Sequence, residues 1–268
     1  MAYVSMKEEQ PYIVVKKANV VYPAILSGHE EQSAGYVEKF SQARKDYLIR
    51  TFNRSKKLFP KAVAILKKYN IPSEFRVLLA LESGFNANAV SKAGAVGYWQ
   101  FMDEVAREYG LKIEARVKAP KIKSVKGKKK KQKTETVQVA KAKKVTVTDE
   151  RKNFLKSTHA AARYLKDRGR NLNNDWLLIA ASYNCGVGNV WNAMERTGKA
   201  NPTFWDIKDL LPSETRTYVM NFIALNVVFH NYEAFTRNKL CFRDEISNWP
   251  LPEEELCEEE FVTAANDY

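Results

Sequence analysis

The chain has 268 residues, of which 45% are hydrophobic and 12% aromatic, enough for one substantial core and too many for a largely disordered protein. No run of about 18 apolar residues occurs, which excludes a transmembrane helix. The net charge of +13 is concentrated in residues 118–144, which contain 12 Lys and a single acid, Glu135. Because the rest of the chain is nearly neutral, we expect no nucleic-acid-binding function.

Residues 1–35 show no helical periodicity and predict an extended N-terminal arm. They also lack the basic and then apolar layout of a signal peptide. The chain is therefore expected to be cytoplasmic, or to have a targeting segment that this sequence does not include. Helical periodicity begins at Tyr36 and continues to Asn70, with a new helix predicted to start at Pro60.

A third helix is predicted from Pro72 to about Ser83, and a further helix ends near Tyr109. Between them, Gly94 and Gly97 predict a bend in the chain.

Residues 117–148 interrupt this helical pattern with a Lys-rich insertion. Its second half alternates apolar and polar residues, which is typical of a solvated β-hairpin, but a disordered basic loop fits equally well. Helical periodicity resumes near Asn153 and again after Asp175, a residue type that caps helix N-termini. The sequence thus predicts an all-α fold class, with a helical domain over 36–230, the insertion within it, and a C-terminal extension with an acidic tail over 231–268.

Three cysteines, Cys185, Cys241 and Cys257, show no metal-binding or redox spacing, so we expect no metal and no cofactor. Cys241 and Cys257 could pair in an oxidising compartment.

A single carboxylate stands in an apolar stretch, LLALESGF. On a helix, Glu82 has Leu78 and Leu79 one turn before it and Phe85 one turn after it, which places it at the apolar face. One interpretation is an edge carboxylate that reaches water or pairs with an Arg. The other is a general acid, because apolar surroundings raise the pKa of a carboxyl group. This interpretation predicts a raised pKa for Glu82 at the floor of a groove.

Neutral hydrogen-bonding side chains near two glycine-containing turns favour the second interpretation. Ser91 and Gln100 flank the Gly94–Gly97 bend, and Tyr183 and Asn184 end an apolar helix just before another glycine turn. Aromatic faces combined with neutral polar groups are typical of a sugar-binding site.

Three ordered motifs carry a resemblance to a known family: ALESGFNANAVSKAGAVGYWQFM, AASYNCGVGNV and LPSETRTYV. Together they resemble the lytic transglycosylases of glycoside hydrolase family 23, and within that family the membrane-bound type. The resemblance covers roughly residues 36–230.

The resemblance implies a lysozyme-like α fold. It also implies cleavage of the β-1,4 bond between N-acetylmuramic acid and N-acetylglucosamine in peptidoglycan, which leaves a 1,6-anhydromuramyl end. Glu82 falls on the family's single catalytic acid/base. The implied substrate-binding residues are Ser91, Gln100, Met102, Tyr183, Asn184 and Glu214.

The sequence is consistent with a single catalytic carboxylate, because no acid lies between Glu82 and Asp103. Ordinary glycosidases use two carboxyl groups, so we expect the N-acetyl group of the substrate to assist. Tyr183 and Ser91 are predicted to hydrogen-bond the acid or this N-acetyl group. Glu214 is predicted to orient nearby backbone or Tyr183, or to be simply an acid in a helix's first turn.

Alternatives to this function are a hydrolytic muramidase and a catalytically inactive wall-binding module. The insertion is expected to cap the groove, to contact an anionic wall polymer, or only to keep the chain soluble. We expect a monomer that acts on peptidoglycan strands, in the periplasm or at the outer membrane. The sequence leaves open whether it would cut within strands or from their ends.

Overall fold

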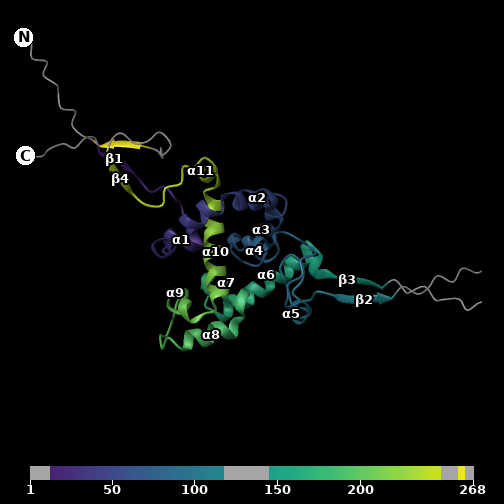
Figure 1. Cartoon of the computed structure of the whole chain (residues 1–268). Coiled ribbons are helices and arrows are strands. Elements are labelled where there is room, and N and C mark those ends of the chain that lie inside the picture. Colours follow the sequence, from purple (N-terminus) through teal and green to yellow (C-terminus); the bar gives the residue numbers. More distant parts are fainter. Residues whose placement is uncertain (1–12, 118–144, 249–258, 263–268) are drawn as a thin grey trace, which may run out of the picture.

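Helices make up most of the computed structural model, which describes residues 13–117, 145–248 and 259–262 (Figure 1). The prediction of a mainly helical fold is confirmed. The α-helices are α1 (Glu30–Ala43), α2 (Lys45–Ser55), α3 (Phe59–Lys68), α4 (Leu78–Ser83), α5 (Asp103–Glu108), α6 (Phe154–Asn171), α7 (Trp176–Cys185), α8 (Val187–Glu195), α9 (Phe204–Ile207), α10 (Ser213–His230) and α11 (Tyr232–Thr236). Short 3-10 helices are η1 (Ala24–Leu26), η2 (Ser73–Val77), η3 (Glu150–Lys152) and η4 (Lys208–Leu210).

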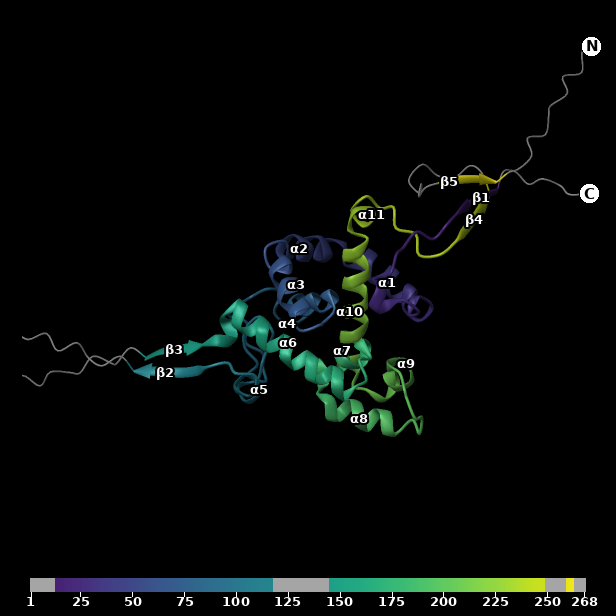
Figure 2. The same ribbon diagram turned by 180° about the vertical axis from the view of Figure 1, so that it is seen from behind.

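Helix α10 runs through the middle of the helical body, with α1 and α7 packed against it (Figures 1 and 2). Its sequence from Val219 to Phe229 is apolar on nearly all sides, as expected for a helix buried all round. Phe222 of α10 packs against Phe75 of η2, with ring centroids 5.2 Å apart. Packing against α10 therefore holds η2, and the helix α4 that follows it, at the centre of the helical body.

Local signals in the sequence set several helix ends. Pro60 lies in the first turn of α3, where its missing N–H costs no hydrogen bond. Asn153 caps α6 and Asp175 caps α7 through hydrogen bonds from backbone N–H groups to their side chains. The predicted cap at Asp175 is confirmed.

The base of the Lys-rich insertion is a β-hairpin. Strand β2 (Ile113–Val117) pairs in antiparallel fashion with β3 (Val145–Asp149), with Ile113 opposite Asp149. Both strands point away from the helical body (Figure 2). Antiparallel pairing is observed at the two ends of the insertion, where β3 includes the predicted VTV segment. Residues 118–144, which include the alternating VQV stretch, lie outside the described part of the chain, so the choice between hairpin and loop for them stays a prediction.

Two segments distant in sequence meet in a small sheet. Strand β1 (Ile13–Lys16) lies between β4 (Glu245–Asn248) and β5 (Glu259–Val262), antiparallel to both. The predicted N-terminal arm and C-terminal extension therefore pair with each other. Helix α1 begins already at Glu30, within the predicted arm, and its two first-turn acids, Glu30 and Glu31, favour a helix start there.

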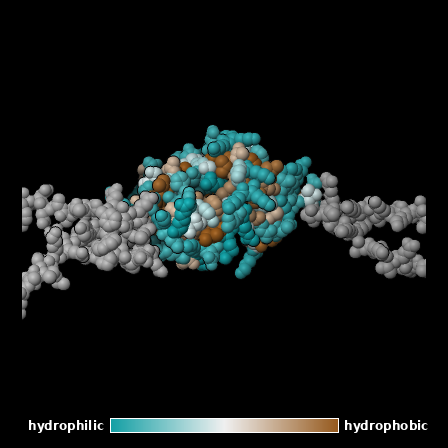
Figure 3. All heavy atoms as spheres, turned by 90° about the horizontal axis from the view of Figure 1, so that it is seen from above, coloured by the Kyte–Doolittle hydropathy of each residue, from teal (hydrophilic) through white to brown (hydrophobic). Residues whose placement is uncertain are grey.

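Most of the surface seen in Figure 3 is hydrophilic, with scattered small groups of hydrophobic residues. Isolated apolar side chains such as Val90 and Leu155 are common on protein surfaces. In the described ranges, none of the helices has the length and apolar character needed to cross a membrane. The possible pair between Cys241 and Cys257 stays a prediction, because Cys257 lies outside the described residues.

The cap of α7 provides a test of this helix assignment. Replacing Asp175 by Ala leaves the N–H groups of Leu177 and Leu178 without their side-chain acceptor. We expect Asp175→Ala to lower the free energy of unfolding by about 1–2 kcal/mol, measured by urea denaturation. Asp175→Asn keeps a capping oxygen and is the matched control. Equal stability of the Ala and Asn variants would contradict the assignment.

Candidate active site

Glu82 lies in the last turn of α4, next to a buried apolar face. Leu78, Leu79 and Ala80 of the same helix are buried, and Glu82 itself is half-buried. Gly84 ends the helix in the left-handed conformation, with φ of +54°. The helix end thus holds the carboxyl group at the edge of the core rather than in open solvent.

Burial raises the pKa of Glu82 from an ordinary 4.5 to about 7, and the negative charge of Glu214 also raises it. A hydrogen bond from Tyr218 acts in the opposite direction, because it stabilises the ionised carboxylate. The direction of this shift is the one that the apolar flank predicts. At neutral pH a large share of Glu82 carries a proton that it can donate.

Tyr218 is the direct partner of this carboxyl group. Its hydroxyl donates a hydrogen bond of 2.5 Å to Glu82 Oε1. Burial, and next to it the charge of Glu82, raise the pKa of Tyr218 well above its ordinary value, so the hydroxyl keeps its proton. Tyr218 lies one turn after Glu214 on α10, which places both side chains on the same side of that helix.

The predicted pair Tyr183 and Asn184 lies at the end of α7. The hydroxyl of Tyr183 donates to the carbonyl of Trp99 at 2.8 Å, so its proton is used within the protein and not on Glu82. Burial raises the pKa of Tyr183, and the charge of Glu82 raises it further, so the two groups lie within electrostatic reach. Asn184 Oδ1 accepts a hydrogen bond of 2.7 Å from Thr215 Oγ1 on α10.

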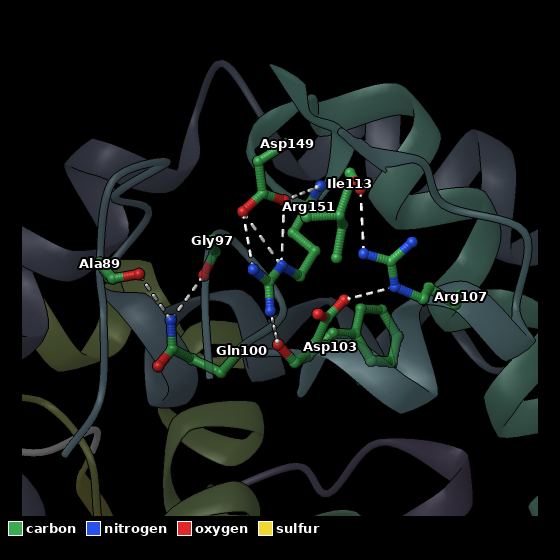
Figure 4. A network of polar contacts seen from close by, with 9 residues as sticks. Ala89, Gly97, Gln100, Asp103, Arg107, Ile113, Asp149 and Arg151 are labelled. Carbon is green, nitrogen blue, oxygen red and sulfur yellow. Dashed lines mark hydrogen bonds and ion pairs between the residues drawn. The ribbon is translucent and has the colours of Figure 1, made fainter. Parts of the chain in front are cut away.

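The bend that follows α4 is held by its own polar side chains. Ser91 Oγ accepts a hydrogen bond from the backbone N–H of Ala95. Gln100 Nε2 donates to the carbonyls of Ala89 and Gly97, at 3.2 and 2.9 Å (Figure 4). Both predicted binding residues therefore fix the shape of the bend.

Ser83 connects the bend to the acid. It follows Glu82 directly, and its hydroxyl lies 2.9 Å from the carbonyl of Tyr98, to which it donates. Met102, just after the bend, exposes 43% of its surface, as expected for a residue that could contact substrate.

An open pocket of about 370 Å³ adjoins the acid's partner. It is lined by Ser213, Glu214, Thr217, Tyr218 and Asn221 of α10. Its lining of hydroxyl, amide and carboxylate groups provides neutral and anionic hydrogen-bonding partners for a polar ligand. Glu214 is exposed in the first turn of α10, where the helix dipole favours an acid.

The structure brings four predicted residues towards one place: Glu82, Tyr183, Asn184 and Glu214. Ser91 and Gln100 act on the neighbouring bend. Sequence reasoning missed Tyr218 and Thr215, although both belong to the quoted motif LPSETRTYV. The available signal was the helical spacing from Glu214 to Tyr218, which puts a tyrosine on the same face as a predicted site residue.

Cys185 is a free, half-buried thiol beside Asn184. Burial raises its pKa, and this disfavours the reactive thiolate. Across the described ranges, no group of three or more His, Cys, Asp and Glu side chains is arranged to hold a metal ion.

Comparison with known proteins identifies relatives of the chain. It matches the transglycosylase SLT domain over residues 61–126 and 130–205. It is 30% identical over 173 residues to membrane-bound lytic murein transglycosylase D of Escherichia coli (strain K12), which covers 63% of this chain and 31% of that protein. It is 25% identical over 147 residues to a putative tributyltin chloride resistance protein of Alteromonas sp. (strain M-1), covering 54% of this chain and 56% of that protein.

Among solved structures, an inactive mutant of the lytic transglycosylase Slt from Pseudomonas aeruginosa is 20% identical, with a TM-score of 0.44 over 65% of this chain and 24% of that chain. The chain spans about a third of the length of the E. coli relative. Because the family match covers more than half of the 268 residues, the chain belongs to the transglycosylase SLT domain family, which confirms the family resemblance. The first two motifs lie within the matched residues, and LPSETRTYV lies after them.

Proposed function

We propose that this lysozyme-like helical domain is a peptidoglycan lytic transglycosylase with Glu82 as its single acid/base. It would cleave the β-1,4 bond between N-acetylmuramic acid and N-acetylglucosamine and leave a 1,6-anhydromuramyl end. The observation that carries the proposal is a carboxyl group with a pKa of about 7, hydrogen-bonded to a half-buried tyrosine, in a member of the SLT domain family. The murein transglycosylase of E. coli supports the choice of substrate.

In the proposed mechanism, protonated Glu82 gives its proton to the glycosidic oxygen as the bond breaks. The substrate's own N-acetyl group stabilises the cationic carbon, as in other substrate-assisted glycosidases. The Glu82 carboxylate then takes the proton of the C6 hydroxyl, whose oxygen attacks that carbon and closes the anhydro ring. The hydrogen bond from Tyr218 stabilises the carboxylate between these two steps.

The remaining predicted residues are proposed to bind the glycan. Met102 and Gln100 would face the sugar chain on one side of Glu82. Asn184 and Glu214 would bind it on the side of α10, next to the pocket that contains Tyr218. Ser91 and Tyr183 are proposed to act mainly by shaping this site, since both use hydrogen bonds within the protein.

The cell envelope is the proposed location, because the substrate is there and the E. coli relative is named as membrane-bound. Periplasmic or outer-membrane-associated action as a monomer on glycan strands stays a prediction. So does contact between an anionic wall polymer and the Lys-rich insertion, whose residues 118–144 lie outside the described structure.

A hydrolytic muramidase is the second candidate function. Glu214 is the specific observation in its favour, because this carboxylate lies close enough to raise the pKa of Glu82. In ordinary two-carboxylate hydrolysis, one carboxyl group protonates the leaving oxygen and the other activates a water molecule. In that case Glu214 would be the base, whereas a substrate-assisted reaction does not need it for chemistry.

The mass of the released muropeptides separates the two functions. We expect the purified chain to release products with anhydro ends from peptidoglycan sacculi, lighter by one water than hydrolysed ends. Exclusively reducing muramyl ends would rule out the transglycosylase and favour the muramidase. No release at all would indicate a wall-binding module.

Replacing Glu82 by Gln removes the acid and keeps its shape. We expect product release to fall by about 10²–10⁴-fold, with glycan binding retained. In Glu214→Gln the loss should be much smaller, because Glu214 has no proton-transfer role in the proposed mechanism. Equal losses in both variants would contradict the single-acid mechanism.

Glu82→Gln also tests the raised pKa of Glu82, through the pH dependence of protein stability. The pKa of folded Glu82, about 7, lies above the ordinary 4.5, so its stabilising contribution is fully present below pH 4.5 and is lost as the pH rises through about 7. Between pH 5 and 8 the melting temperature of the wild type should therefore fall further than that of Glu82→Gln. Parallel curves in differential scanning calorimetry would count against the shift.

Tyr218→Phe removes the hydrogen bond that stabilises the Glu82 carboxylate. The pKa of Glu82 should rise, so the alkaline limb of the pH profile of kcat/KM should move to higher pH while the rate falls. Tyr109→Phe is the control, because that hydroxyl donates to Asp167 and not to Glu82. A limb that stays in place or moves to lower pH would show that Tyr218 does not stabilise the carboxylate.

A further inference from the structure

Arg151 is a buried arginine at the base of the Lys-rich insertion. It lies in η3, directly after strand β3, and exposes 7% of its surface. Its guanidinium forms a two-pronged ion pair with Asp149, with Nε 2.9 Å from Oδ1 and Nη2 2.8 Å from Oδ2. Burial alone would raise the pKa of Asp149, but the hydrogen bonds and charge of Arg151 outweigh it and keep that pKa below its usual value. Arg151 is therefore held rigidly in place as a charged pair.

The same arginine contacts the bend beside the proposed active site. Its Nη1 donates to the carbonyl of Phe101 at 3.2 Å, so its guanidinium lies between Asp149 and the 97–101 segment (Figure 4). Its backbone carbonyl packs directly on Gly97. A Cβ atom at Gly97 would lie only 2.2 Å from that oxygen, and the φ of Gly97 is +86°, which also favours glycine.

The 97–101 segment in turn contacts the groups around Glu82. The carbonyl of Tyr98 accepts the hydrogen bond of Ser83, the residue after the acid. The next carbonyl, of Trp99, accepts the hydrogen bond of Tyr183. A shift of this segment would therefore move both the end of α4 and the tyrosine whose pKa responds to the charge of Glu82.

We propose that Arg151, fixed by Asp149, is a positioning residue that sets the 97–101 segment against Glu82, which makes this ion pair part of the catalytic scaffold. This inference rests on the proposed function for the role of Glu82. Arg151 does not touch Glu82 and acts through the carbonyls of Tyr98 and Trp99. Its guanidinium binds two partners at fixed angles, a geometry that lysine does not reproduce.

A purely stabilising role is the rival explanation, because breaking a buried ion pair destabilises many proteins. The two roles differ in what they change. If the ion pair only stabilises the fold, breaking it lowers the melting temperature and leaves the turnover of the folded enzyme intact. If the pair positions the active site, breaking it lowers kcat in the folded enzyme with a smaller change in KM, because misplaced groups lose mainly transition-state stabilisation.

The experiment compares Arg151→Lys and Asp149→Asn with a matched control, Glu150→Gln. Glu150 lies in the same short helix, but its carboxylate accepts hydrogen bonds from the backbone of Lys112 and from Lys156 and so ties the hairpin base to α6. Reactions use soluble, uncross-linked peptidoglycan strands, at a temperature where each protein is fully folded. Amide hydrogen exchange at Gly97, whose N–H is bonded to the carbonyl of Ala89, reports on the segment independently of activity.

We expect kcat to fall by about 10–100-fold in Arg151→Lys and Asp149→Asn, with faster exchange at Gly97, and wild-type values for both in Glu150→Gln. Wild-type kcat in the folded Arg151→Lys and Asp149→Asn proteins would overturn the positioning role, whatever their melting temperatures or exchange rates. Should Arg151→Lys fail to fold, Asp149→Asn decides alone. The product masses of the wild type, measured in the same reactions, test the proposed function. The ratio of variant to wild-type kcat tests the positioning role, so the two can fail independently.

Discussion

The hydrogen bond between Tyr218 and Glu82 joins two parts of the chain that are 136 residues apart, and the chemistry of the site depends on it. Burial by the apolar end of α4 makes the carboxyl group hold a proton, and the tyrosine limits that effect by stabilising the ionised form. The balance leaves a pKa of about 7, where one group can both donate and accept a proton near neutral pH. At neutral pH, burial alone would leave the carboxyl group mostly neutral, and the tyrosine hydrogen bond alone would leave it mostly charged.

Much of the fold serves to keep these two side chains together. Helix α10 carries Tyr218 and is buried along most of its length, so its position is fixed by the core. Helix α4 is short, but η2 before it packs against the same core through Phe75 and Phe222. After α4, the bend from Ser91 to Phe101 is fixed by its own hydrogen bonds, by Tyr183 and by Arg151 at the base of the insertion.

The parts of this site that sequence predicts are those that depend on local pattern. The apolar neighbours of Glu82 lie within one or two helical turns, so its raised pKa can be anticipated from the sequence. The cap at Asp175 and the helix start at Pro60 are local as well. Alternation in a solvated, Lys-rich stretch does not decide between a hairpin and a loop. Strand pairing is observed only at the two ends of the insertion, between β2 and β3.

The parts that sequence does not predict depend on contacts between distant segments. The spacing from Glu214 to Tyr218 places the two side chains on one face of a helix, but it does not indicate that the Tyr218 hydroxyl meets Glu82. Tyr183, the tyrosine predicted to bond the acid, donates to the carbonyl of Trp99 instead. Arg151 follows the Lys-rich insertion in a charged stretch, between Glu150 and Lys152, and resembles part of a solvated segment, yet it is buried. The pairing of β1 with β4 and β5 likewise joins two chain ends whose composition indicates no partner.

The central claim is that Glu82 exchanges its proton near neutral pH. The most direct measurement is an NMR titration of the protein labelled with ¹³C at the glutamate side-chain carboxyl carbons, with the Glu82→Gln spectrum used to assign the resonance. We expect a midpoint of about 7 for Glu82. A midpoint near the ordinary value of 4.5 would contradict it, because the carboxyl group would then be ionised before any glycosidic oxygen could receive its proton.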